Sequence, residues 1–374
     1  MKKLSGRERL TRIFQGKEVD RPSLKLWGFY PEQKLLHPDY APVCAKAEEL
    51  TDWWLGGGSG FDIVFGCHRS DCVSVETKSV SELWEEVTTT WNTPRGVLRE
   101  REMVSTIGGP GYTIEHAIKS PQDIEAILSI PYEPFPMDAK SYFQADAKAA
   151  DRGIAAFGLD HPSYALQRLM GSELLAIFSI DERELLHRII NVFAARVLDH
   201  AKKAIDAGVR GVFAWVGPEL FIPPLMAPND FEDFCFDYDK TLCDLIHNAG
   251  GYTWLHCHGK IAKFVDRFID MGIDVLNPLE PPKNGDVDMM SLVGQFGNRM
   301  GWEGNIEIQE IIQASPERLV NLIRSCVAAG RTSGRFILCP SAGFMEYPFP
   351  ESEYIRNLLI YLEEGNREIC SSVS

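Results

Sequence analysis

The sequence lacks the features that mark several other classes of protein. Nowhere do about 18 apolar residues follow one another, and the charged start MKKLSGRERLTRIFQGKEVDRP has no apolar h-region, so we expect a cytoplasmic protein with no membrane partner. The formal net charge of −15 argues against a nucleic-acid partner, because phosphate binding requires clustered Lys and Arg. The 9 cysteines form no CxxC pair, which excludes a zinc ribbon and a thioredoxin-like site, and we expect reduced thiols.

The composition is that of a globular protein with ample material for a core. Hydrophobic residues make up 45% and charged residues 24% of the 374 residues. There is no internal repeat, no low-complexity tract and no linker of Pro, Gly and Ser long enough to separate two domains. Because α/β barrels routinely exceed the usual domain size, we expect residues 1–374 to form a single domain.

Short apolar runs, each followed by a helical pattern, recur along the chain. Their continuous apolar character indicates strands buried on both faces, and their alternation with helices indicates parallel βα units. The runs are LKLWG at 24–28, FDIVFG at 61–66, IAAFG at 154–158, GVFAWVG at 211–217, YTWLHCHG at 252–259, IDVLNPLE at 273–280, NRMGWEGN at 298–305 and RFILCPS at 335–341. Eight such units predict an α/β protein with a single (β/α)₈ TIM barrel.

Some of the helices carry clear start and stop signals. Ser120 and Ser315 each stand before a proline, which is the pattern of an N-cap residue followed by a first-turn proline. A long amphipathic helix is predicted from about 182 to 207, and Gly208 is placed to end it.

The hydrophobic period changes between roughly residues 74 and 112. VTTTWNTPRGVLREREMV predicts two polar, twisted strands joined by a Thr-Pro-Arg-Gly turn, that is, a β-hairpin inserted over one mouth of the barrel. A solvated hairpin that only caps the barrel fits this pattern at least as well as one that contacts a substrate or a partner.

The stretch WLHCHGK contains two imidazoles on either side of a thiol. In a strand the side chains alternate, so His256 and His258 share one face and Cys257 packs on the other. Residues near the carboxyl end of a barrel strand lie where active sites of barrel enzymes are built. A pair of histidines with core partners is the alternative, but each would then need its own buried hydrogen-bond partner.

Two later strands supply further candidate ligands, the carboxylate of Glu280 and the thiol of Cys339. Glu280 ends the next predicted strand, and the two prolines after it cannot continue a ladder, so it should reach the same mouth. His256, His258 and Glu280 would form the three-ligand pattern of catalytic zinc, with one position open. Cys339 could complete the tetrahedron, or it could be a buried small hydrophobic residue.

Other polar residues occupy equivalent strand ends. Because they share this location, we take them as candidate catalytic or substrate-contacting residues, and helix capping is the alternative reading of each. They are Glu303 with Asn305 in GWEGNIE, Glu219 in WVGPELF, and Asp160 with His161 in GLDHPSY.

Several motifs together resemble the uroporphyrinogen decarboxylase superfamily. They are RERLTRIFQGKEVDRP, FGLDHPSYALQRLMG, AGVRGVFAWVGPELFIPPLMAPNDFEDF, WLHCHGKI and SGRFILCPSAGF, which span most of the chain. That superfamily also includes methylcobalamin:coenzyme M methyltransferases, corrinoid-linked O-demethylases and, more distantly, cobalamin-independent methionine synthase. The resemblance implies a single (β/α)₈ barrel.

The decarboxylase branch implies an activity that the residues here fit less well. Its members carry an arginine-rich RQAGRY stretch, which binds the carboxylates of a porphyrinogen. The corresponding stretch here reads LKLWGFYPEQ, with only Lys25. A substrate with many carboxylates requires such cations, so we rank decarboxylation second.

The methyltransferase branch implies a zinc site on these strands. Its members use His-x-Cys, a Glu in some members, and a Cys near the last strand. Here His256 matches the His, His258 stands where the Cys would be, and Glu280 matches the Glu. The last Cys would be expected near Ser341, and the nearest thiol is Cys339. The site would hold zinc or a harder divalent metal.

The resemblance therefore implies a metal-dependent methyltransferase as the leading hypothesis. The methyl group would pass to or from a corrinoid (cobalamin) on a partner protein, with a small-molecule methyl donor or acceptor. A third hypothesis is a non-catalytic barrel that binds a corrinoid or another small ligand. The methyl donor, the acceptor and the oligomeric state, including a homodimer, are left open.

Overall fold

The computed structural model describes residues 3–29, 31, 37–107, 110–343, 349 and 351–371. Two residues of the predicted insertion, 108 and 109, lie outside the described residues, as do residues 30 and 32–36 after the first predicted strand.

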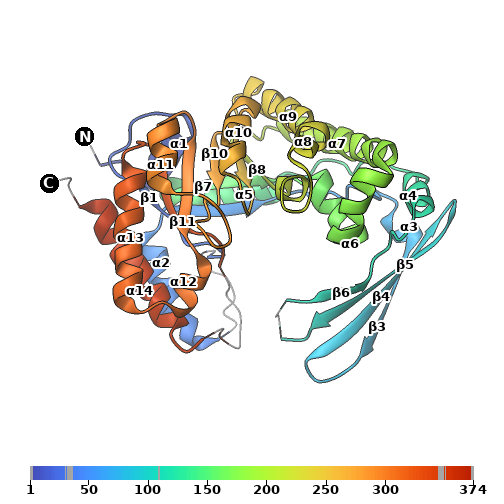
Figure 1. Ribbon diagram of the computed structural model, residues 1–374, viewed down its shortest axis with the longest axis horizontal. Helices are drawn as coiled ribbons and strands as arrows, with labels where there is room; N and C mark the ends of the chain where they lie inside the picture. Colours follow the sequence, from blue (N-terminus) through green and yellow to red (C-terminus); the bar gives the residue numbers. More distant parts are fainter. Residues whose placement is uncertain are drawn as a thin grey trace.

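Strands and helices alternate along most of the chain (Figure 1). The strands are β1 Ser23–Leu24, β2 Trp53–Gly57, β3 Val73–Ser79, β4 Trp84–Thr93, β5 Gly96–Ser105, β6 Tyr112–Glu115, β7 Gly153–Gly158, β8 Val212–Val216, β9 Tyr252–His256, β10 Val275–Asn277, β11 Gly301–Ile306 and β12 Phe336–Pro340. The α-helices are α1 Gly6–Phe14, α2 Ala41–Leu50, α3 Arg69–Cys72, α4 Pro121–Leu128, α5 Lys140–Ala149, α6 Pro162–Asp181, α7 Arg183–Asp206, α8 Pro228–Phe231, α9 Asp237–Asn248, α10 Val265–Met271, α11 Met289–Phe296, α12 Ile308–Gln313, α13 Pro316–Arg331 and α14 Tyr354–Cys370. Short 3₁₀ or π segments cover Pro38–Tyr40, Ala150–Arg152, Pro218–Phe221, Glu232–Phe236 and Ala262–Phe264.

The parallel strands form the predicted (β/α)₈ barrel. Their order in the sheet is β1-β12-β11-β10-β9-β8-β7-β2, so each strand pairs with its neighbour in the chain order of the barrel. The two ends of this sheet meet where the backbone N–H of Asp52 donates to the carbonyl of Leu24 at 2.9 Å. The carboxyl ends of all eight strands therefore share one mouth, which is where polar strand-end residues can meet.

The second strand of the barrel differs from the prediction. Residues 61–66 form a turn, and Trp53–Gly57 provides β2 instead. The reason is local: the Asp62 carboxylate accepts hydrogen bonds from the backbone N–H groups of Val64 and Phe65, both at 2.9 Å, and so holds them away from a ladder. The two glycines at the end of β2 concealed the strand in the sequence, because glycine is depleted in strands.

The interior of the barrel is closed at the opposite end by α1. Leu10, Ile13 and Phe14 pack with inward-facing residues of the strands, among them Ile154, Val212, Trp254, Val275 and Ile337. The amphipathic α1 thus plugs the amino-terminal end of the barrel, which leaves the carboxyl-end mouth as the open end of the barrel interior.

The insertion is a four-stranded antiparallel sheet and not a two-stranded hairpin. Its strand order is β3-β4-β5-β6, and the predicted turn joins β4 to β5 with Thr93 paired to Gly96. The strand β3 was missed because VSVETKS alternates weakly. The sheet extends away from the barrel beside α6, on the side opposite α13 and α14 (Figure 1).

The predicted helix signals are confirmed. Helix α4 begins at Pro121 and α13 at Pro316, and the Ser315 hydroxyl accepts from the backbone N–H of Arg318. Helix α7 is followed by Gly208, whose φ of +103° favours glycine. Among the described residues, no helix combines the length and apolar character needed to cross a bilayer.

A buried arginine ties α1 to the barrel wall. The Arg9 side chain, 2% exposed, donates to Asp20 at 2.8 Å and to Asp52 at 2.6 Å, and also to the carbonyl of Leu4. Asp52 also accepts from the hydroxyl of Ser23, so this group of contacts lies where β1 and β2 meet.

Replacing Arg9 by Met should destabilise the barrel. The substitution keeps an unbranched apolar stem but leaves the carboxylates of Asp20 and Asp52 without their buried cation, which typically costs about 3–5 kcal/mol in the free energy of unfolding. Urea unfolding followed by circular dichroism measures the change. Lys17→Met, at an exposed position nearby, is the control and should shift the free energy by less than about 0.5 kcal/mol; equal effects of the two would contradict the assignment.

Candidate functional site

The two histidines of the WLHCHGK stretch lie at the barrel mouth. His256 is the last residue of β9, on the inward side that also carries Trp254. Cys257 faces outward into the helix layer and is fully buried, as predicted from strand alternation. The chain turns at Gly259, whose φ of +91° lies in the region that favours glycine, and this turn leaves His258 partly exposed at the mouth.

Hydrogen bonds determine which ring nitrogen of each histidine carries hydrogen. The amide nitrogen of Asn277 donates to Glu303 at 3.2 Å, so its carbonyl oxygen faces His256 Nδ1 at 2.6 Å and accepts that N–H. His258 Nδ1 donates to Glu280 Oε1 at 2.9 Å. Both Nε2 atoms are thus left with lone pairs when the rings are neutral.

Those two Nε2 atoms lie only 2.8 Å apart. Two lone pairs at this distance repel each other unless a cation lies between them, and the cation is either a shared proton or a metal ion. Tetrahedral zinc with bonds of about 2.0–2.1 Å would separate two nitrogens by about 3.3 Å, so the rings would open by about half an ångström. The donor chemistry of the pair therefore fits a divalent metal.

The two rings differ in their protonation. Burial, together with the neighbouring His258, lowers the pKa of His256 to about 3, so this ring stays neutral near pH 7. Burial also lowers the pKa of His258, but the hydrogen bond to Glu280 and the charges of Glu280 and Glu219 outweigh it and leave that pKa above its ordinary value. The proton shared by the pair therefore belongs to His258.

Glu280 approaches the far side of His258 and not the gap between the two rings. One carboxylate oxygen accepts from His258 and the other accepts from the backbone N–H of Gly259 at 2.8 Å. Burial raises the pKa of Glu280, but the contact with His258 dominates and holds it below its ordinary range. In this arrangement Glu280 orients His258, as carboxylates commonly do for metal-bound histidines.

Glu303 lies deeper in the barrel, fully buried. Its carboxylate accepts from Lys25 at 2.7 Å, from the indole of Trp254 at 2.8 Å and from Asn277. The Lys25 ammonium also lies over the rings of Trp54 and Trp254, at 4.0 and 4.9 Å from their centroids. Glu303 thus contributes to the site indirectly: it orients the amide of Asn277, and the amide oxygen then accepts the N–H of His256.

Cys339 is placed beside Glu303 on β12. Burial and the Glu303 charge raise the pKa of its thiol well above the ordinary value, so it is protonated. Its sulfur does not come within 4.8 Å of both imidazole nitrogens, and the same holds for the carboxylates of Glu280 and Glu219. Of the four predicted ligands, the structure therefore brings His256 and His258 to a common point.

Glu219 lies on the β8 side of the mouth, within electrostatic reach of His258 and His161. Burial raises the pKa of its carboxyl group above the ordinary value. The hydrogen bond from the backbone N–H of Gly217 lowers this pKa, but it offsets the effect of burial only in part. A carboxyl group whose pKa is raised in this way is a better proton acceptor than an ordinary glutamate.

His161 has a structural role in a closed network. It caps α6, its Nε2 donates to Asp239 at 3.0 Å, and Asp239 also accepts from Trp215 at 2.9 Å. Among the described residues, His161, Cys235 and Asp239 are the one group of three ligand atoms within 4.8 Å of one another. These hydrogen bonds already satisfy the polar atoms of the group, so the geometry does not require an ion there.

Asp160 lies beside His161 but faces a different space, the cavity under the inserted sheet. Burial raises the pKa of its carboxyl group, and the charge of Arg168 counteracts this only in part. The four predicted catalytic residues thus separate: Glu303 lies under the histidine pair, Glu219 beside it, His161 in the wall and Asp160 across the mouth.

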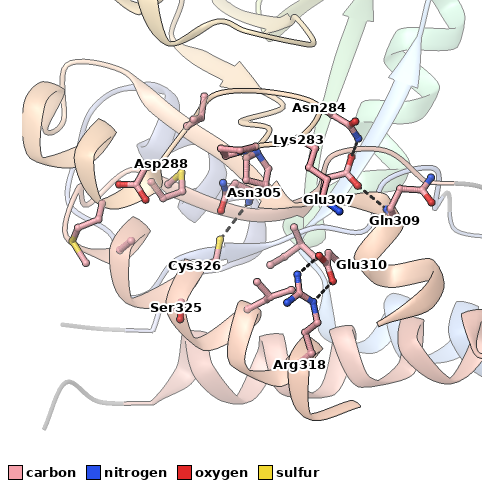
Figure 2. A pocket seen from close by; sticks show the side chains of 18 of the residues that line it. Lys283, Asn284, Asp288, Asn305, Glu307, Gln309, Glu310, Arg318, Ser325 and Cys326 are labelled. Atoms are coloured by element: carbon pink, nitrogen blue, oxygen red, sulfur yellow. Dashed lines mark hydrogen bonds and ion pairs between the residues drawn. The ribbon is translucent and has the colours of Figure 1, made fainter. Parts of the chain in front are cut away.

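A separate cavity of about 490 Å³ lies outside the barrel between β11, α11 and α13 (Figure 2). Its polar side chains already bind each other: Arg318 contacts Glu310, and Asn284 donates to Glu307 at 2.7 Å. Burial raises the pKa of the Cys326 thiol in its wall to about 12. Because these polar groups are paired and the thiol is protonated, this cavity offers less chemistry than the mouth.

Two residues of the site were not recognised in the sequence as its members. Asn277 interrupts the apolar run of β10, and Lys25 interrupts the run that follows β1. A single polar residue within a continuous apolar strand was the available signal, because such a residue must find a buried partner.

The chain is similar in sequence to known decarboxylases. A family model described as uroporphyrinogen decarboxylase (URO-D) matches residues 160–351. The curated uroporphyrinogen decarboxylase of Synechococcus sp. is 24% identical over 155 residues, which cover 40% of this chain and 40% of that protein. That of Thermosynechococcus vestitus is 22% identical over 206 residues, 53% of this chain and 56% of that protein. The chain thus matches less than two thirds of the length of these relatives.

A solved structure described as a methyltransferase from Methanosarcina mazei has the same fold. It aligns with a TM-score of 0.60 and 13% identity over 98% of this chain and 99% of that chain. This likeness over the whole length agrees with the barrel described above.

The pKa values of the two histidines should be shifted in opposite directions from the ordinary value. In protein treated with a chelator, His256 should stay neutral down to a pKa of about 3, whereas His258 should titrate above 6.5. NMR of the imidazole rings measures both. Stability should fall as the pH decreases from 6.5 towards 3 because of His256, and the contribution of His258 should be lost as the pH rises through its raised pKa.

Glu280→Gln provides the control for this titration. It removes the charge that holds the proton, so the pKa of His258 should fall below its wild-type value while His256 remains neutral. A pKa of His258 that does not change in this variant would show that Glu280 does not govern it.

Proposed function

Because the chain belongs to the uroporphyrinogen decarboxylase family, we propose that within this family it is a metal-dependent methyltransferase. The methyl group passes to or from a corrinoid carried by a partner protein. The observation that supports this proposal is the pair of Nε2 atoms of His256 and His258, 2.8 Å apart at the mouth, with both rings oriented by other hydrogen bonds.

The residues of the site divide into ligands and residues that orient them. His256 and His258 would hold zinc or another divalent metal, and the remaining positions are open to an incoming group. Glu280 orients His258, and Asn277 orients His256. The ion pair of Lys25 and Glu303 holds Asn277, so the orientation of His256 depends on residues in the barrel interior.

A bound metal of this kind supplies a Lewis acid that lowers the pKa of an acceptor thiol. In this proposal Glu219 takes up the thiol proton, and the support for this role is that burial raises the pKa of its carboxyl group. Held by His256 and His258, the metal would present a thiolate nucleophile to the methyl group of the partner's methylcobalamin, and the two electrons of the broken carbon–cobalt bond would remain on the corrinoid. His258 is partly exposed and would therefore be accessible to these reactants.

Decarboxylation is the second candidate, since the curated relatives are named for it. The charges at the mouth are unfavourable for a substrate with several carboxylates: Glu219, Glu280 and Glu307 all act on His258, and Lys25 is already bound to Glu303. Such a substrate requires a cluster of cations, and the described mouth residues are mainly acidic.

Removing one imidazole should remove the metal and the activity together. His258→Ala should lower zinc content, measured by mass spectrometry of purified protein, from about one per chain to less than about a tenth. Transfer of methyl from methylcobalamin to mercaptoethanol, followed by absorbance, should slow at least about 100-fold. Glu280→Gln should weaken metal binding by about 10–100-fold, because it disorients His258.

His68→Ala is the matched control, because His68 precedes α3 and its ring nitrogens face Asp71 and Glu133 and not the histidine pair. Its metal content and methyl transfer should equal those of the wild type. Unchanged metal content in His258→Ala would refute the metal site. Release of carbon dioxide from uroporphyrinogen by metal-free protein would favour the decarboxylase.

A further inference from the structure

A cavity of about 330 Å³ lies between the inserted sheet and the rim of the barrel mouth. One wall is a single face of the sheet, formed by Thr89 and Trp91 of β4 with Glu100 and Glu102 of β5. The opposite wall is formed by the turn at residues 61–65, by Asp160 after β7, and by Arg168 and Leu169 of α6. None of these residues makes the hydrogen bonds that orient the histidine pair, which come from Asn277 and Glu280.

The acidic side chains of this cavity outnumber the basic ones. Asp62 and Arg69 form an ion pair at 3.3 Å, which leaves Glu100, Glu102 and Asp160 facing the single guanidinium of Arg168. No hydrogen bond or ion pair joins any of these three carboxylates to a cation within the part of the chain that the structure describes. An excess of half-buried carboxylates without partners is unfavourable unless a cation enters.

The protonation of Glu100 reflects this imbalance. Burial and the neighbouring Glu102 raise the pKa of its carboxyl group to about 7, although Arg168 and Arg69 act in the opposite direction. The carboxyl group therefore takes up a proton more readily than an ordinary glutamate, and a cationic ligand would favour its charged form.

The indole of Trp91 provides a second and independent sign of a ligand. Its side chain is 4% exposed and lines the cavity, and its N–H has no hydrogen-bond acceptor among the described residues. Trp91 packs against Phe65 with ring centroids 4.7 Å apart, which keeps the indole in place. A buried donor without an acceptor is rare in native proteins and is commonly satisfied by a bound group.

A metal ion does not fit the carboxylates of this cavity. The oxygen atoms of Glu100, Glu102 and Asp160 do not all lie within 4.8 Å of one another, as ligands of one ion would. The distribution of charge instead suits a larger cation that contacts several carboxylates, and the aromatic rings of Phe61, Phe65 and Trp91 suit a methylated ammonium group.

We propose that this cavity is a second binding site, which takes a small organic ammonium compound that also carries an oxygen acceptor. The ammonium group lies against Glu100, Glu102 and Asp160, and the oxygen accepts the indole N–H of Trp91. The site uses residues other than the histidine pair, so it does not depend on the proposed methyl transfer.

Calorimetric titration with choline tests this site directly. At pH 8 choline should bind, and dimethylbutanol, its uncharged carbon isostere, should bind at least about tenfold more weakly. Binding of choline should weaken as the pH falls from 8 to 6, because Glu100, surrounded by Glu102, Asp160, Arg168 and Arg69, takes up a proton near pH 7.

Two substitutions test separately the contact of the ammonium group with Glu100 and the hydrogen bond from Trp91 to the ligand oxygen. Glu100→Gln should weaken choline binding at least about tenfold, whereas Glu76→Gln, an equal change of charge at an exposed position of the same sheet, should not change it. Trp91→Phe keeps the ring packing and should weaken choline about fivefold without changing tetramethylammonium, which has no oxygen.

Three results would overturn the proposal: no binding of choline, equal binding of choline and dimethylbutanol, or wild-type affinity in Glu100→Gln. Metal content and methyl transfer should be unchanged in Glu100→Gln, so the outcome is distinguishable from a failure of the metal site.

Discussion

The buried carboxylate of Glu303 is the group on which the barrel mouth depends. A charge with no exposed surface is tolerated only when its hydrogen bonds are complete, and here Lys25, Trp254 and Asn277 all donate to it. Because Asn277 donates to Glu303, its oxygen must face His256. One ion pair inside the barrel thus determines which nitrogen of a histidine at the mouth is free to bind a ligand.

The mouth divides into two electrostatic regions. The histidine pair lies where β9 and β10 end, and burial together with nearby carboxylates gives one neutral and one readily protonated ring. Across the mouth, under the inserted sheet, carboxylates outnumber cations in the second cavity. Carboxylates are prominent in both regions, which agrees with the net charge of −15 and is unfavourable for a substrate bearing many carboxylates.

The similarity to known proteins is not uniform along the chain. The family model covers residues 160–351, the part that carries His256, His258 and Glu280. The inserted sheet, with Trp91 and Glu100, lies before that range. The part that matches the family therefore holds the proposed metal pair, whereas the second cavity is formed by residues from both parts, with Trp91 and Glu100 before the matched range and Asp160 and Arg168 within it.

The sequence by itself determined the barrel and the shared face of His256 and His258, because strand alternation and βα succession are local patterns that survive in any context. It misplaced one strand, since the Asp62 side chain competes with the ladder over a few residues. Only the tertiary structure decided that Glu280 turns to His258 and Gly259, and that Lys25 meets Glu303 from a distant part of the chain. The partner of a carboxylate depends on how loops and strands from the whole barrel meet, and no local pattern contains that information.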